Sequence, residues 1–399
     1  MTGTAEGDEL AVSARWIEAL DRQSVIMMAI FARAGFEPVA PAVIQPADVF
    51  LDLIGEDLRG RTYVFSDPSG AELCLRPDLT IPACRLYLAR HGAEAPASRF
   101  AYNGVVFRYQ PTGGNLVRPR EFRQAGIESF AADDPGRADA EILALSVEAV
   151  RAAGLRAFKL RVGDLGIFDA LLEAVEMPDR WRVRLRHHFR HPDAFRRQLR
   201  HIVQPNTAGL EIPDELLRRL TAADENTAIA EIEAYCAAHD LTITGTRTLE
   251  EIAAHLKGIG EDLQERPLSK EAAGLIDAYL RVEAPARAAM AQIRSLTSAA
   301  GIDVSAALDA YEARIALAAQ EGIEMGDAHF SASFGRAFAY YTGFVFEITS
   351  SALGDTTPIG GGGRYDTLME TISGAGRVPA VGAAIHSERL LLAVRGGRP

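Results

Sequence analysis

The positions of the β-type segments restrict the fold of this chain more than any other feature, because a long helical region separates them. Residues 100–130 contain two strand-like runs, YNGVVFRYQ and REFRQAGIESF, and strand-like sequence returns at His329. Between about residues 165 and 325 the apolar residues recur at helical spacing and alanine is abundant. We therefore expect an α+β fold in which residues 1–165 and 326–399 build one core around an α-rich insertion, residues 166–325.

The composition indicates a globular protein that works in a reducing compartment. The chain has 399 residues, of which 48% are hydrophobic and 24% charged, and this length suggests two or three domains. Its three cysteines, Cys74, Cys84 and Cys236, show no CxxC spacing. Neither a signal sequence nor an apolar run long enough to span a membrane is visible, so we expect a cytoplasmic protein. The net charge of −12 argues against wholesale binding of a polyanion.

The first group of candidate ligand-binding residues lies on the two strand-like runs. It consists of Arg108, Arg118, Arg120, Gln124 and Glu128. Arg108 lies in the middle of a strand-like run, where a guanidinium is costly unless it faces solvent or pairs with an anion. Gln124 and Glu128 are an even number of residues apart, so a strand presents both on one face. Such a polar face is either solvated or lines a ligand site.

Two further groups could bind a ligand. Asp78 and Thr80 lie in the segment RPDLT, where an aspartate could also cap the helix that follows. Arg336, Tyr340 and Tyr341 lie in the largely apolar segment FGRAFAYYTGFVFE. A buried cation favours a carboxylate ligand, and tyrosine hydroxyls can hydrogen-bond an imidazole, although paired tyrosines also occur in ordinary cores.

The segment at 334–347, together with IGGGGRYD at 359–366 and PAVGAAIHSERL at 379–390, resembles the histidine-specific strand and the last catalytic motif of histidyl-tRNA synthetase, a class II aminoacyl-tRNA synthetase. The resemblance implies the class II catalytic core, which is a mixed, mainly antiparallel sheet flanked by helices. It also implies that the helical segment 10–34 and the following segment with Pro41 form the family's dimer-interface element.

The resemblance assigns roles to the candidate residues. In the family, the loop that corresponds to RPDLT holds the α-ammonium group of the ligand, which places Asp78 and Thr80 there. The arginine at the position of Arg108 contacts a phosphate or carboxylate, and the residues at Gln124 and Glu128 line the histidine pocket. We therefore expect Asp78, Thr80, Arg108, Gln124, Glu128, Arg336, Tyr340 and Tyr341 to form a histidine-like pocket, with no metal and no cofactor.

Several positions depart from the synthetase pattern, and they fall on its nucleotide half. Gln110 stands where the synthetase has a glutamate, and Ala339 where it has an aspartate. His386 replaces a glycine that leaves room for adenine in the family, so a ring is added where the backbone approaches a ligand. The chain also ends at Pro399, so we expect no anticodon-binding domain.

A retained histidine pocket with a weakened ATP site resembles a paralogous family, the regulatory subunits of ATP phosphoribosyltransferase. This resemblance implies a non-catalytic subunit that acts in the first step of histidine biosynthesis and in its feedback by histidine. It implies self-association as a dimer and a hetero-octamer with the short-form catalytic subunit. The alternative is a histidyl-tRNA synthetase-like enzyme that activates histidine with ATP.

A basic run at residues 180–200 contains eight arginines and a single acidic residue, Asp193. Its spacing suits helices with a basic outer face. A solvated or protein-contacting face, an anion or phosphate site, and an RNA-binding surface all remain open, and the few aromatic residues disfavour RNA.

Overall fold

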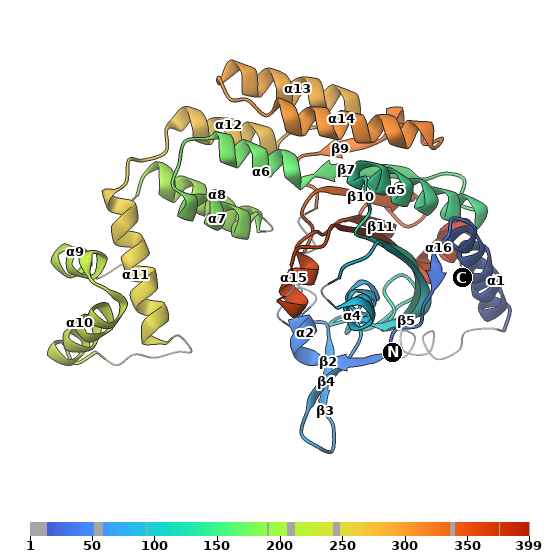
Figure 1. The fold of residues 1–399 in the computed structure, drawn as a ribbon, viewed down its shortest axis with the longest axis horizontal. Helices are drawn as coiled ribbons and strands as arrows, with labels where there is room; N and C mark the ends of the chain where they lie inside the picture. The colour runs from blue at the N-terminus through green and yellow to red at the C-terminus, as the bar shows by residue number, and fades with distance from the viewer. Residues whose placement is uncertain are drawn as a thin grey trace, which may run out of the picture. The chain divides into compact units, whose positions relative to one another are not determined.

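The computed structural model describes residues 14–51, 59–92, 94–189, 191–205, 212–241, 248–335, 340–374 and 376–398. The chain divides into two compact units (Figure 1): Met1–Ala174 together with Asp277–Pro399, and Val175–Ile276. The smaller unit lies within the α-rich region that the sequence predicts at 166–325, whereas residues 277–325 group with the larger unit.

The larger unit is built on one mixed sheet, and its strands come from both β-rich regions of the sequence. In spatial order the described strands are β1 (Glu37–Pro38), β5 (Ser98–Phe107), β6 (Glu121–Phe130), β12 (Ala380–His386), β11 (Pro358–Arg364), β10 (Phe344–Thr349), β7 (Lys159–Asp164), β9 (His329–Ser331) and β8 (Glu283–Pro285). Only the pairs β1–β5 and β7–β9 are parallel in this described sheet. The predicted mixed, mainly antiparallel sheet is thereby confirmed.

The pairing of β6 with β12 joins the two β-rich regions and determines which residues meet. Glu128 lies opposite Gly382, and Gln124 lies opposite His386. The even-numbered residues of β6 share one face: Phe122 packs in the cluster of Leu79, and Phe130 stacks on Tyr87 at 4.5 Å between ring centroids. Gln124 and Glu128 therefore lie on one face, as the strand periodicity predicts.

Helices cover both faces of this sheet (Figure 1). The face with the even-numbered residues of β6 packs against α4 (Thr80–His91). On the other face lie α1 (Ala14–Arg33) and α5 (Pro135–Ala152), and Arg123 of β6 forms an ion pair of 2.5 Å with Asp21 of α1. The remaining described helices of this unit are α2 (Ala47–Leu51), α6 (Leu165–Ala174), α13 (Ala286–Ala299), α14 (Ser305–Gln320), the 3-10 turn η1 (Met325–Asp327), α15 (Leu368–Ser373) and α16 (Ser387–Val394).

A small separate sheet contains the hairpin that the turn sequence DPSG predicts. Its strands are β2 (Ile44–Pro46), β4 (Glu72–Leu75) and β3 (Tyr63–Ser66), in that order. Asp67 shapes the turn, because its Oδ1 accepts hydrogen bonds from the backbone N–H groups of Ser69 and Ala71, at 2.8 and 3.0 Å.

Buried ion pairs connect the helices to the sheet. Arg314 of α14 contacts Asp139 of α5 at 2.7 Å and Asp164 of β7 at 2.6 Å. Arg364 of β11 contacts the same Asp139 at 2.7 Å and Asp366 at 2.9 Å. Because each buried carboxylate meets a guanidinium, the charges compensate one another in the interior.

The smaller unit is helical. Its described helices are α7 (Asp179–His188), α8 (Pro192–Val203), α9 (Asp214–Ala222), α10 (Glu225–Ala238), α11 (Leu249–Gln264) and the start of α12 (Lys270–Leu280). Thr248 and Glu251 form a capping box at the start of α11. Leu217, Leu220 and Ile232 belong to the apolar core between α9, α10 and α11. Of the helices within the described ranges of the whole chain, none combines enough length with enough apolar sequence to cross a lipid bilayer.

Candidate functional site

A cavity of about 190 Å³ in the larger unit brings together most of the candidate residues. Those that line it are Asp78, Thr80, Arg108, Gln124, Tyr340 and Tyr341. Glu128 lies directly behind the cavity wall formed by Gly382, and Arg336 lies outside the described residues. Arg118 and Arg120 are not among the lining residues. The cavity is smaller than the ~300–1,000 Å³ sites of drug-sized ligands, and its size suits a small metabolite.

Glycines on β11 and β12 let the cavity approach the backbone. A Cβ atom on Gly382 would lie 1.5 Å from Glu128 Oε2, and one on Gly362 would lie 2.2 Å from the carbonyl oxygen of Gly382. Any side chain at these positions would displace either the Glu128 carboxylate or a neighbouring strand. The glycine cluster IGGGGRYD thus allows the neighbouring strands to pack closely behind the site.

Two buried carboxylates belong to the site, Asp78 in the cavity lining and Glu128 behind it. Glu128 is fully buried and accepts hydrogen bonds from the hydroxyls of Tyr102, at 2.8 Å, and Tyr365. Burial raises the pKa of Glu128 to about 7, against the opposing effect of these hydroxyls. Asp78 is also buried, and burial raises its pKa although Arg108 lowers it. Its Oδ1 accepts from the N–H of Ile81 at 3.2 Å, which is the helix-end contact anticipated for this residue.

Two arginines, Arg108 and Arg389, also line the cavity, and Arg108 lies close enough to Asp78 for each to shift the pKa of the other. Arg108 donates from Nε to the carbonyl of Pro77 at 2.8 Å. Arg389 donates from Nε to the carbonyl of Val117 at 2.8 Å and from a terminal nitrogen to that of Pro358 at 2.9 Å. Burial, and then the positive charges of Arg108, Arg118 and Arg61, lower the pKa of Arg389 to about 10. This repulsion means that Arg108 and Arg389 together would attract an anionic group.

Aromatic rings also line the cavity. The centroids of the Tyr340 and Tyr341 rings lie 5.0 Å apart, and those of Tyr340 and Tyr365 lie 5.8 Å apart. The imidazole of His386 stacks on Phe122 at 4.0 Å, with 9° between the planes. His386 remains neutral, because burial and then Arg389 and Arg108 lower its pKa well below the usual value.

Three side-chain atoms of the lining residues are buried and have no hydrogen-bond partner in the part of the chain that the structure describes. They are Asp78 Oδ2, Gln124 Oε1 and His386 Nε2. Unpaired buried polar atoms are costly, and a ligand with suitably placed donors would pair them. The arrangement can therefore bind a small molecule that carries both a cationic group, for the carboxylates, and an anionic group, for the arginines.

Sequence reasoning missed several residues that shape the site. Tyr102 and Tyr365 hold Glu128, Phe122 stacks on His386, and Arg389 lines the cavity. Tyr365 and Arg389 lie in the motifs that suggested the site, but their spacing gives no sign of which group they contact. Gln110 accepts a hydrogen bond from Arg61 at 2.8 Å and donates one to the carbonyl of Pro119 at 3.2 Å. Ala339 lies outside the described residues.

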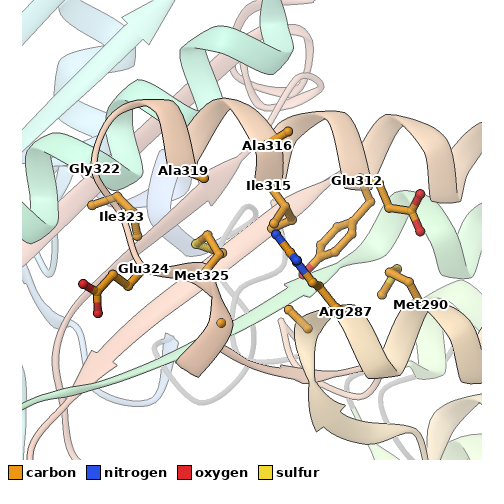
Figure 2. A pocket seen from close by; sticks show the side chains of 13 residues that line it. Arg287, Met290, Glu312, Ile315, Ala316, Ala319, Gly322, Ile323, Glu324 and Met325 are labelled. Atoms are coloured by element: carbon orange, nitrogen blue, oxygen red, sulfur yellow. The ribbon is translucent and has the colours of Figure 1, made fainter.

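A larger cavity of about 860 Å³ lies between α13 and α14 (Figure 2). Met290, Ile315, Ile323 and Met325 give it apolar walls, and the figure shows charged side chains, such as Glu312, around them. None of the candidate residues lines this cavity. The smaller cavity is the better functional candidate, because buried charges and unpaired polar atoms meet there.

In the smaller unit, part of the basic run surrounds one buried carboxylate. Asp262 of α11 has a fully buried side chain, and it receives hydrogen bonds from Arg180 at 3.0 Å, Trp181 at 2.6 Å and Arg184 at 2.6 Å. His201 lies 3.4 Å from the same carboxylate. These members of the run are thus structural, whereas Arg196, Arg197 and Arg200 are exposed.

Comparisons with known proteins agree with this architecture. The sequence model of the family described as histidyl-tRNA synthetase matches residues 8–270 and 258–390. Solved structures with similar folds include an ATP phosphoribosyltransferase regulatory subunit/histidyl-tRNA synthetase from Bacillus halodurans, with a TM-score of 0.62, 22% identity, and coverage of 98% of this chain and 82% of that one. Histidyl-tRNA synthetase from Nostoc sp. has a TM-score of 0.60 and 16% identity, and the match covers 98% of this chain and 77% of that one.

Proteins related in sequence identify the family more closely than the solved structures do. The ATP phosphoribosyltransferase regulatory subunit of Allorhizobium ampelinum is 36% identical, over 91% of this chain and 95% of the relative. The protein of the same name from Rhizobium meliloti is 35% identical, over 93% of this chain and 96% of the relative. The chain therefore has the fold of histidyl-tRNA synthetase and belongs to the family of ATP phosphoribosyltransferase regulatory subunits.

Proposed function

We propose that this chain is the non-catalytic regulatory subunit of a cytoplasmic ATP phosphoribosyltransferase, and that its pocket binds free histidine as the feedback signal. The partner is a short-form catalytic subunit, which it joins as a dimer within a hetero-octamer. The names of relatives that match nearly the full length of the chain support the subunit role.

The observation that carries the ligand is the meeting of buried, unpaired polar atoms at a cavity lined by both acidic and basic side chains. Asp78 and Thr80 would hold the α-ammonium group, and Arg108, with Arg336, the α-carboxylate. Gln124, Tyr340 and Tyr341 would surround the imidazole, and Glu128 would lie behind them. A ligand without the imidazole donors would leave buried acceptors unpaired, which is the basis of selectivity.

Regulation requires that histidine bind one arrangement of the complex more tightly than another. A difference of ~1–3 kcal/mol between the two arrangements is typical of allosteric coupling. The Arg364–Asp139–Arg314 ion pairs provide a physical connection from the strand β11 beside the pocket to helix α14.

The test combines a partner assay with a ligand assay. A tagged form of this chain should co-purify with the short-form catalytic subunit and raise its phosphoribosyltransferase activity. Titration calorimetry should show histidine binding that Glu128→Ala abolishes. Glu121→Ala, an exposed glutamate on the same strand, should leave the affinity unchanged.

Unchanged histidine affinity in Glu128→Ala would refute the pocket, and failure to bind or activate the catalytic subunit would refute the subunit role. The synthetase fold favours one alternative, a histidine-activating enzyme. That enzyme would catalyse histidine-dependent exchange of pyrophosphate into ATP, which we expect to be absent.

A further inference from the structure

The cavity of about 860 Å³ between α13 and α14 lies apart from the histidine-like pocket (Figure 2). Among the described residues, none lines both cavities. Met290 of α13 and Met325 of η1 belong to its apolar walls, together with Ile315 of α14. Methionine side chains adapt their shape to a bound partner, so such walls are typical of surfaces that receive another protein.

A second hollow adjoins this cavity on the same unit. It has a volume of about 660 Å³, is lined in part by residues of α5, and shares Gly322 and Ile323 with the cavity between α13 and α14. The two hollows together form one surface, which we name the α14 groove. It is bordered by α13, η1 and α5, with the C-terminal half of α14 between them.

The α14 groove has the length that a helix needs in order to dock. Tyr311, Ile315 and Ala319 line it at intervals of four residues, so they follow one side of α14. Eight residues of helix rise about 12 Å. The apolar anchors of an amphipathic helix, at positions i, i+3 or i+4 and i+7, span about the same distance. The groove between α13 and α14 therefore fits the apolar face of a third helix.

The lining of the α14 groove is predominantly acidic. It contains five glutamates and two arginines: Glu141, Glu148, Glu312, Glu321, Glu324, Arg151 and Arg287. Figure 2 shows Glu324 beyond Met325 on one side and Glu312 beyond Ile315 on the other. Within the described part of the chain, neither Glu321 nor Glu324 has an ion-pair partner, whereas both glutamates of α5 pair with arginines at 2.5 Å. This charge favours a partner that carries positive groups beside its apolar anchors.

We propose that the α14 groove is the docking site for a basic amphipathic helix of the short-form catalytic subunit. The inference rests on the proposed function, which gives the chain this partner. Apolar side chains of the helix fill the cavity between α13 and α14, and its lysines or arginines lie against Glu321 and Glu324. Arg314, whose ion pair with Asp139 leads towards β11 beside the pocket, lies on the same helix α14. The docked helix would thus contact the element that the proposed regulation uses.

A variant that obstructs the groove tests the docking site. Ala319 is exposed and lines the cavity, so Ala319→Arg adds bulk and positive charge without replacing a buried side chain. We expect it to weaken binding of the purified catalytic subunit at least about 30-fold, since loss of a hot-spot contact costs about 2 kcal/mol or more. Ala310→Arg is the matched control, because Ala310 is exposed on the same helix and lines neither hollow. Surface plasmon resonance measures both affinities and the association rates.

Two further variants test the chemistry of the occupant. Glu321→Lys/Glu324→Lys should slow association about tenfold at low salt and reduce its salt dependence, because the steering charge is reversed. Ala316, which is also exposed in the lining, can be replaced by the photo-cross-linking residue p-benzoylphenylalanine. Mass spectrometry should then find a basic amphipathic helix of the catalytic subunit attached to it. A cross-link to an acidic segment, or unchanged association of the charge-reversed variant, would overturn the proposal.

The outcomes separate the docking site from the proposed function. If the wild type binds the catalytic subunit and Ala319→Arg binds it equally well, the docking site is refuted and the subunit role stands. If the wild type does not bind it, the proposed function fails and the docking site fails with it. Weaker self-association of Ala319→Arg in sedimentation, with unchanged binding to the catalytic subunit, would make the groove a contact between copies of this chain and refute the proposal. Circular dichroism checks the fold, and Ala316→Arg replaces Ala319→Arg if that variant does not fold.

Discussion

Glu128 gives the sharpest prediction, because its burial affects both stability and ligand binding. The carboxyl group is fully buried between Tyr102 and Tyr365, and its pKa rises from 4.5 to about 7, mainly through burial. The difference between these pKa values corresponds to ~3 kcal/mol, at ~1.4 kcal/mol for each tenfold change. The folded protein binds the proton more tightly than the unfolded chain, so this contribution to stability is present below pH 4.5 and is lost as the pH rises through 7.

Replacement of Glu128 by glutamine removes the titration and keeps a hydrogen-bond acceptor for one tyrosine. The free energy of unfolding of the wild type, relative to that of Glu128→Gln, should fall by about 3 kcal/mol between pH 5 and pH 8. Urea unfolding followed by circular dichroism at several pH values measures this difference. Burial also raises the pKa of Glu388 to about 7, but both proteins contain Glu388, so its effect cancels.

Parallel stability curves for the wild type and Glu128→Gln would refute the reasoning. They would mean that the folded state stabilises the charged carboxylate as well as water does. A histidine titration of the wild type and Glu128→Gln at pH 8 adds a second measurement. At that pH the ionised Glu128 carboxylate of the wild type should attract a cationic or proton-donating ligand most strongly.

Two further substitutions test the packing within each unit. Asp262→Ala should destabilise the smaller unit by roughly 2–4 kcal/mol, because the Trp181 N–H is left unpaired and Arg180 and Arg184 lose the carboxylate that they share. Hydrogen exchange in α7 and α11 should then rise. The exposed Asp193→Ala is the control, and equal exchange in both variants would contradict this role. Gly362→Ala should cost about 1–3 kcal/mol or more, because its Cβ would lie 2.2 Å from a carbonyl oxygen, whereas Gly258→Ala, with nothing within 4 Å, should not destabilise the protein in thermal unfolding.

Local patterns in the sequence were enough to predict many of the elements. The hairpin around Asp67, the capping box of Thr248 and the two long strands β5 and β6 follow from turn chemistry, capping and the period of two. Each depends on residues close together in the chain. The same period correctly placed Gln124 and Glu128 on one face of the sheet.

Other features could not be predicted, because they join residues that are far apart in the sequence. The basic run suggested an outer face, yet Arg180, Trp181 and Arg184 converge on Asp262, about eighty residues away. No spacing rule links these positions, because the contact depends on how α7 packs against α11. Helix packing therefore decides which carboxylate pairs with a given guanidinium.

The candidate site also combines features that the sequence predicted with features that only the tertiary structure shows. Sequence alone predicted the sheet, the fold family and the side chains with ligand chemistry, because motif residues keep their order and spacing. The tertiary structure decided which groups those side chains meet. The register of β6 against β12 places Glu128 beside Gly382 and His386 beside Gln124, and the fold brings Tyr365 to Glu128. A shift of one residue in that register would turn each of these side chains to the other face, so the pocket exists only once the two distant strands have paired.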